Sequence, residues 1–371
     1  MIQKALRTGD PSAFDAISDY LASLPFYAGE TPAVQFGSML SDARPVSIGR
    51  LLVSVARRDG IDHALEGFDE LLALEENDLM IMVYVDNVET SEPVDLGDGV
   101  VALPSTTAPT ADFGKAIRDF RNPSIHRKGA ILVTEARQRA FRRLDPAADF
   151  PQAVGAIAEP VPGIDKIQAA LRLMVLDGPS APVVRLTSYR VQSGVPRLWE
   201  QPTGVNVEPI GGYVRSMPHV ITGKVRELRP RYAALPVADR KRIDLALVRL
   251  GRAVLADSPA DAIVETAIAL EAVLGDARQE LKYRVQLRAA LLLETEYASR
   301  LATKRTVGRL YDERSAIVHT GTLHSGDLEL SAQGIRVTAR LLERLLEIGH
   351  IPDWNMIELT GGAISPAANS V

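Results

Sequence analysis

The C-terminal third of the chain carries apolar residues at the spacing of amphipathic helices. Ile243, Leu247 and Leu250 form one such stripe. Ser258, followed by a proline at the first helical position, is a typical helix start. The periodicity predicts helices over residues 238–256, 260–275, 279–294, 298–319 and 331–349. These consecutive helices predict an all-α bundle.

The first 220 residues show a different pattern, in which short apolar runs rich in β-branched residues alternate irregularly with helical segments. The runs predict strands over residues 79–88, 99–103, 129–135 and 182–191. Helical spacing predicts helices over residues 12–24, 47–57, 61–75 and 166–176. Because no regular βαβ alternation is present, we expect an α+β fold with mixed short strands and helices.

The change of pattern predicts two domains. Residues 1–228 would form the α+β domain, for which we expect a sensing or restraining role. Residues 229–371 would form the helical bundle, whose small and polar tail from Gly361 onward is expected to fray.

The composition is typical of a globular protein without disulfides. Hydrophobic residues make up 46% of the 371 residues, and there is no cysteine. The lack of thiols excludes thiol catalysis and thiolate metal sites, and it fits a reducing cytoplasm. The sequence shows neither the pattern of a secretory signal nor an apolar run long enough to span a membrane. We therefore expect a cytoplasmic protein that does not contact a membrane.

The net charge of −5 argues against a protein that coats nucleic acid. Arginine and lysine nevertheless cluster in residues 137–143, 224–231, 240–252 and 300–309. These clusters indicate either a local basic groove or solvated helix faces, and the sequence leaves both interpretations open.

Common catalytic and cofactor motifs are missing from the chain. There is no phosphate-binding GxxxxGK[ST] loop, no GxGxxG after a strand, no HExxH and no GxSxG. His319 and His324 are close enough in sequence to share a metal, but no carboxylate or histidine supports them at helical spacing. We therefore predict no metal site and no cofactor.

Arginine followed five positions later by histidine is the pattern that points to chemistry, because arginine can hold a phosphate and histidine can transfer a proton near neutral pH. The pattern occurs as Arg58…His63, Arg121…His126 and Arg314…His319. The first pair spans Gly60, where a helix is expected to break, and the second contains Pro123. The third lies in an uninterrupted helical pattern.

Two residues five positions apart are about 140° apart around a straight helix. Arg314 and His319 would therefore converge only where the helix ends, near Thr320 and Gly321, or across two subunits.

Three sequence blocks resemble the HEPN superfamily, and within it most closely the Apea-like HEPN group. In order, the blocks are ALEAVL at 269–274, YRVQLRAALL at 283–292 and LYDERSAIVH at 310–319. The resemblance covers about residues 232–350, roughly a third of the chain. Members of the superfamily carry an Arg-x4–6-His motif late in a helical bundle. Many active members have Asn, Asp or His directly after the arginine, where this chain has Ser315.

The resemblance implies a metal-independent endoribonuclease that acts on RNA as a homodimer, in the manner of antiphage or abortive-infection effectors. His319 would be the general acid or base, and Arg314 would hold the phosphate. Glu271 would orient Arg314, and Ser315 would position either partner. The arginines expected to bind flanking phosphates of the RNA are Arg284, Arg288 and Arg309.

Other interpretations remain open. Arg314 can be a structural ion-pair partner of Glu271 or Asp312, and Arg284 and Arg288 can be a solvated helix face. The bundle can be a non-catalytic module for dimerisation or nucleotide binding. The N-terminal domain can be the functional part and bind a small molecule or a phage component as a trigger.

Overall fold

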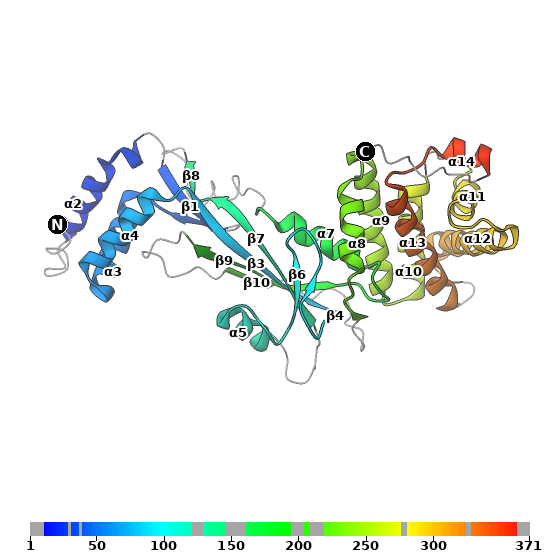
Figure 1. The fold of residues 1–371 in the computed structure, drawn as a ribbon, viewed down its shortest axis with the longest axis horizontal. Coiled ribbons are helices and arrows are strands. Elements are labelled where there is room, and N and C mark those ends of the chain that lie inside the picture. Colours follow the sequence, from blue (N-terminus) through cyan, green and yellow to red (C-terminus); the bar gives the residue numbers. More distant parts are fainter. Residues whose placement is uncertain are drawn as a thin grey trace.

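The computed structural model describes residues 11–28, 31–36, 39–120, 129–144, 161–193, 204–207, 219–275, 280–321, 323 and 328–361. The molecule is elongated, with helices and a β-sheet in its N-terminal part and helices alone from residue 224 onward, as far as the chain is described (Figure 1). This confirms the predicted contrast between a mixed N-terminal part and a helical C-terminal part.

A six-stranded antiparallel sheet is the centre of the N-terminal part. Its strands, in spatial order, are β10 (Gly204–Val207), β9 (Val183–Ser193), β3 (Glu76–Asp86), β7 (Gly129–Arg139), β6 (Val101–Pro104) and β5 (Val94–Asp95). β3 pairs with β7 along its whole length, from Glu76 opposite Arg139 to Asp86 opposite Gly129. From Ile81 to Asp86 every side chain of β3 is buried, because other elements cover both faces of the sheet there.

Two smaller sheets accompany this one. The first is antiparallel and has the order β2 (Met39–Asp42), β1 (Thr31–Phe36) and β8 (Phe141–Leu144). The second pairs β11 (His219–Val220) in parallel with β4 (Val88–Glu89), just after the end of β3. β11 thereby places the start of the helical part beside the central strand.

Helices pack on the sheet and form the N-terminal end of the described molecule. They are α2 (Pro11–Ala22), α3 (Pro45–Asp59), α4 (Ile61–Ala73), α5 (Ala111–Phe120) and α7 (Ile164–Met174), with a short 3-10 helix η1 (Pro25–Tyr27) after α2. Phe113 and Ile117 of α5 pack on Met82, Tyr84 and Leu186 on one sheet face. The other face contributes to a large core that also contains α7.

The helical part is built around α10. Its helices are α8 (Lys224–Ala233), α9 (Val237–Leu255), α10 (Pro259–Leu274), α11 (Leu281–Leu293), α12 (Tyr297–Thr320), α13 (Leu328–Ile348) and α14 (Trp354–Thr360). α10 contacts α9, α11, α12 and α13. It can do so because its sequence is rich in small and apolar residues, such as Ala267, Leu270 and Val273, which are all fully buried.

Individual residues determine where α10 begins and where α12 ends. The Ser258 hydroxyl accepts a hydrogen bond from the Asp261 amide at 3.1 Å, and Pro259 occupies the first turn of α10. α12 ends at Gly321, which adopts a left-handed conformation (φ 71°) that favours glycine. α12 is therefore continuous through Arg314 and His319.

All the helices predicted for the C-terminal region are confirmed, with ends that differ by no more than three residues. α8 and α14 were missed: α8 contains Pro230, and α14 has only seven residues. The predicted central strands are confirmed in position, and β3, β7 and β9 have 11 residues each, so β7 is longer than its predicted range of 129–135. The reason is that backbone pairing with a neighbour extends a strand into polar sequence such as Ala136–Arg139.

The predicted domain boundary after residue 228 falls inside α8, which begins at Lys224. α8 also packs against both α7 and α13, so it belongs to the junction between the two parts. One continuous cluster of buried apolar side chains extends from Ile17 in α2 to Ile357 in α14. The sheet and the bundle therefore share a core.

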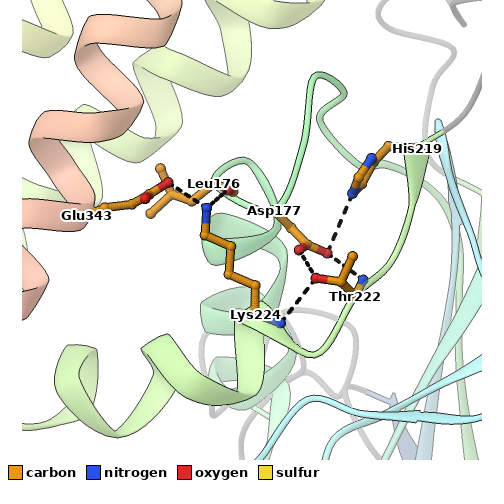
Figure 2. Close-up of polar contacts among 6 residues, drawn as sticks. All are labelled: Leu176, Asp177, His219, Thr222, Lys224 and Glu343. Carbon is orange, nitrogen blue, oxygen red and sulfur yellow. Dashed lines mark hydrogen bonds and ion pairs between the residues drawn. The ribbon is translucent and has the colours of Figure 1, made fainter.

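Polar contacts reinforce this junction (Figure 2). The Lys224 ammonium donates to the Leu176 carbonyl at 2.7 Å and pairs with Glu343 of α13 at 2.7 Å. These contacts tie the first residue of α8 to the chain just after α7 and to α13.

Asp177 holds the segment that leads into α8. Its carboxylate accepts hydrogen bonds from the Thr222 amide at 2.7 Å and from the Thr222 hydroxyl. His219 Nε2 lies 3.7 Å from the same carboxylate, whose side chain is 1% exposed. The His219 ring also lies directly against Gly178, where a Cβ atom would overlap it.

Replacing Gly178 with alanine is expected to lower the free energy of unfolding by about 1–3 kcal/mol, because the added methyl group overlaps the His219 ring. Urea denaturation measures the loss. In a His219→Ala background the same change should be much less destabilising, since the overlap is gone. An equal loss in both backgrounds would show that overlap with the His219 ring does not cause the destabilisation.

Candidate functional site

Arg314 and Glu271 face each other where α12 contacts α10. The Arg314 Nη2 to Glu271 Oε1 distance is 3.7 Å, and the side chains are 35% and 23% exposed. Among the described residues, neither Arg314 Nε nor Glu271 Oε1 has a hydrogen-bond partner, although both atoms are buried. The pair is therefore a loose ion pair in which the guanidinium keeps unused donors. An incoming anion could bind to such donors.

Tyr311 lies one turn before Arg314 on α12, and its buried hydroxyl lies close to the Glu271 carboxylate without a hydrogen bond of standard geometry to it. Burial, followed by the negative charge of Glu271, raises the pKa of Tyr311. Its hydroxyl is therefore neutral at physiological pH and remains a donor close to Glu271. Nothing in the sequence pattern placed Tyr311 beside Glu271.

His319 and Ser315 lie on the exposed surface of the same helix. α12 ends one residue after His319, as Gly321 indicated, but both Arg314 and His319 lie within the helix. Their separation around the axis is thus about 140°. The helix end does not bring the pair together within one chain, so of the four predicted catalytic residues only Arg314 and Glu271 meet.

The prediction that Arg288 binds RNA is corrected by its surroundings. Its side chain is fully buried, with Nε 2.7 Å from Glu358 Oε1. Nη1 donates to the Leu274 carbonyl, and the guanidinium carbon lies 5.5 Å from the Trp354 ring centre. Arg288 joins α11 to the end of α10 and to α14, and it is not accessible to a phosphate.

The other two predicted RNA-binding arginines lie nearer the surface. Arg309 is exposed on α12, and Arg284 is half-buried on α11. Close by, the exposed ring of Tyr283 lies 4.9 Å from the Lys304 ammonium. The binding of RNA phosphates by Arg284 and Arg309 therefore remains a prediction.

Of the other two Arg-x4-His pairs, only Arg58 and His63 lie among the described residues, and they do not converge. Arg58 and His63 are separated by the break between α3 and α4 at Gly60, and Arg58 pairs with its neighbour Asp59 at 2.8 Å. Arg121 and His126 lie outside the described residues, as does His324.

Two further features of the described residues bear on the kind of protein. No group of three or more His, Asp or Glu side chains in them converges closely enough to hold a metal ion. No described helix combines the length and the apolar character needed to cross a membrane.

Comparison with known proteins identifies no neighbour: no family model, no curated protein and no solved structure matches the chain.

Replacing Arg288 with glutamine should lower the free energy of unfolding by about 3 kcal/mol, because it leaves the Glu358 carboxylate without its buried partner. The matched control is Arg284→Gln, one turn earlier on α11 and half-buried, for which a loss below about 1 kcal/mol is expected. Urea denaturation of both variants tests the assignment. Similar losses would contradict a structural role that is special to Arg288.

Proposed function

We propose that the protein is a metal-independent endoribonuclease whose active site forms in a homodimer of the helical part, as the HEPN resemblance implies. The observation that carries the proposal is the incomplete hydrogen bonding of the Arg314 side chain. Glu271 holds its guanidinium at 3.7 Å, yet Arg314 Nε keeps an unused donor, and Ser315 and His319 are exposed on the same end of α12.

The chemistry needs only these groups and the RNA itself. His319 removes the proton from a ribose 2′-hydroxyl, and the oxygen attacks the adjacent phosphorus. Arg314 binds the phosphate and offsets the negative charge that grows in the transition state. The P–O5′ bond breaks, a proton returns to the leaving oxygen, and the products are a 2′,3′-cyclic phosphate and a 5′-hydroxyl.

Glu271 and Ser315 have supporting roles in this proposal. Glu271 restricts the guanidinium to one side of α12, so the entropy of ordering Arg314 is lost on folding and not on RNA binding. The Ser315 hydroxyl follows Arg314 directly and can hydrogen-bond to the same phosphate. Arg284 and Arg309 would contact flanking phosphates.

The N-terminal part would sense a trigger or restrain the nuclease, consistent with an antiphage or abortive-infection effector. The shared core supports this role, because a change in the sheet can reach the bundle through α7 and α8.

The second candidate is a non-catalytic bundle that dimerises or binds a nucleotide. The same ion pair favours it, because Arg314 and Glu271 also join α12 to α10 as a structural contact would. The two candidates differ in whether Arg314 and His319 are needed for cleavage.

Alanine substitution of Arg314 or of His319 is expected to reduce cleavage of total RNA or tRNA by at least about a hundredfold in the presence of EDTA. Gel electrophoresis and detection of cyclic-phosphate ends give the readout. Arg305→Ala is the control, since Arg305 is exposed on α12 and about 180° from Arg314 around the axis. A wild-type protein that is inert with all tested triggers, or one that EDTA inactivates, contradicts the proposal.

Mixing the two inactive variants tests whether the site spans two subunits. If Arg314 of one subunit works with His319 of the other, an Arg314→Ala/His319→Ala heterodimer keeps one intact site. Random mixing of subunits then restores about a quarter of the wild-type activity. Unmixed variants provide the baseline. No recovery, despite proven subunit exchange, would place both groups of each site in one chain.

A further inference from the structure

Two adjoining cavities lie where α7, α8 and α9 meet the turn between β5 and β6. The smaller has a volume of about 290 Å³ and the larger about 730 Å³. Asp98, Arg229 and Ala233 line both. Arg229 therefore faces both cavities at the junction of the sheet and the bundle.

Arg229 has more donors than the protein satisfies. Its side chain is 6% exposed, and Nη2 donates to Asp98 Oδ2 at 3.1 Å and to the Lys166 carbonyl at 2.9 Å. Nη1 is buried and has no hydrogen-bond partner among the described residues. An unsatisfied donor on a buried cation is energetically unfavourable, so an acceptor is expected there.

The charges around the smaller cavity also favour an anion. The Lys166 ammonium lies 3.5 Å from Asp98, so Lys166 and Arg229 share one carboxylate. Arg240 donates from Nη2 to the Ala233 and Leu235 carbonyls, at 2.6 and 3.1 Å. Its Nε is a second buried donor without a partner in the described structure.

The negative charge of Asp244, which also lines the smaller cavity, is already neutralised. Asp244 pairs with Arg172 at 3.2 Å and accepts a hydrogen bond from the Tyr232 hydroxyl at 2.5 Å. Burial, and next the hydrogen bond to Asp244, raise the pKa of Tyr232, so its hydroxyl is neutral and donates. Asp165 is the remaining carboxylate of the lining and is exposed. The four cationic side chains of the lining therefore exceed its three carboxylates by one positive charge.

We propose that the 290 Å³ cavity binds a phosphate group, either as the free ion or as part of a small phosphorylated molecule. Arg229 Nη1 and Arg240 Nε are the donors that the protein leaves unused, and Lys166 adds charge beside them. A cavity of this size admits a small molecule and not a nucleic-acid strand. The site does not depend on the proposed ribonuclease activity, because none of its residues belongs to the Arg314 cluster.

Isothermal titration of the full chain with inorganic phosphate and, separately, with adenosine monophosphate tests the proposal at constant ionic strength in chloride buffer. The wild-type protein should bind at least one probe and melt at a higher temperature in its presence. Equal affinity for both probes identifies the free ion as sufficient. At least about tenfold tighter binding of the nucleotide identifies a phosphorylated small molecule.

Substitutions that change the local charge in opposite directions locate the site. Lys166→Gln and Arg240→Gln should each weaken phosphate binding by about tenfold. Asp165→Asn should strengthen binding by roughly a few fold, because it removes a negative charge near the bound phosphate. Arg229 is not replaced, because its side chain is only 6% exposed and its loss would disturb the packing of the junction itself. Melting temperatures without phosphate check that each variant is folded.

Arg252→Gln is the matched control, because Arg252 is exposed on α9 and lines neither cavity. Its affinity should equal that of the wild type. The absence of heat and of a melting shift with both probes would overturn the proposal. Binding that Lys166→Gln, Arg240→Gln and Asp165→Asn leave unchanged would overturn it as well.

Discussion

The burial of α10 is the constraint on which the helical part depends. Four helices surround it, so the carbonyl groups of its last turn cannot all reach water and need donors from the protein. Arg242 of α9 donates to the Ala272, Val273 and Gly275 carbonyls at 2.8–3.2 Å, and Arg288 of α11 donates to Leu274. Two arginines thus become structural because a helix end is buried. This explains why Arg288, on a helix with a plausible RNA-binding pattern, is unavailable to RNA.

The same burial shapes the surroundings of Arg314. Glu271 projects from the central helix into a partly buried space, where an unpaired carboxylate is unfavourable, and α12 supplies Arg314 and Tyr311 beside it. The fit is incomplete, since Arg314 Nε, Glu271 Oε1 and the Tyr311 hydroxyl all lack hydrogen bonds of standard geometry among the described residues. A fully satisfied network would be a structural contact alone. The unused Arg314 donor is what the proposed binding of an anion at this contact would need.

The junction between the sheet and the bundle concentrates charged groups for a related reason. Apolar packing continues through it, but the ends of α7, β11 and α8 meet there and leave backbone groups to be satisfied. Asp177 and Lys224 satisfy those on one side (Figure 2). On the other side, Arg229 satisfies the Lys166 carbonyl and still keeps a free donor next to a cavity. A ligand bound there would contact both parts at once, which is a physical route by which the N-terminal part can influence the bundle.

The sequence by itself determined the helices of the bundle and the positions of the central strands, because apolar periodicity and helix-end residues such as Ser258 and Gly321 act locally. The resemblance of the sequence blocks also implied that Glu271 orients Arg314, while the sequence left Asp312 open as the alternative partner. Only the tertiary structure decided that Arg288 is buried, that Tyr311 joins Glu271, and that Arg229 faces two cavities with an unused donor. The role of an arginine depends on which carbonyls and carboxylates distant segments bring to it, and helical spacing carries no information about those segments.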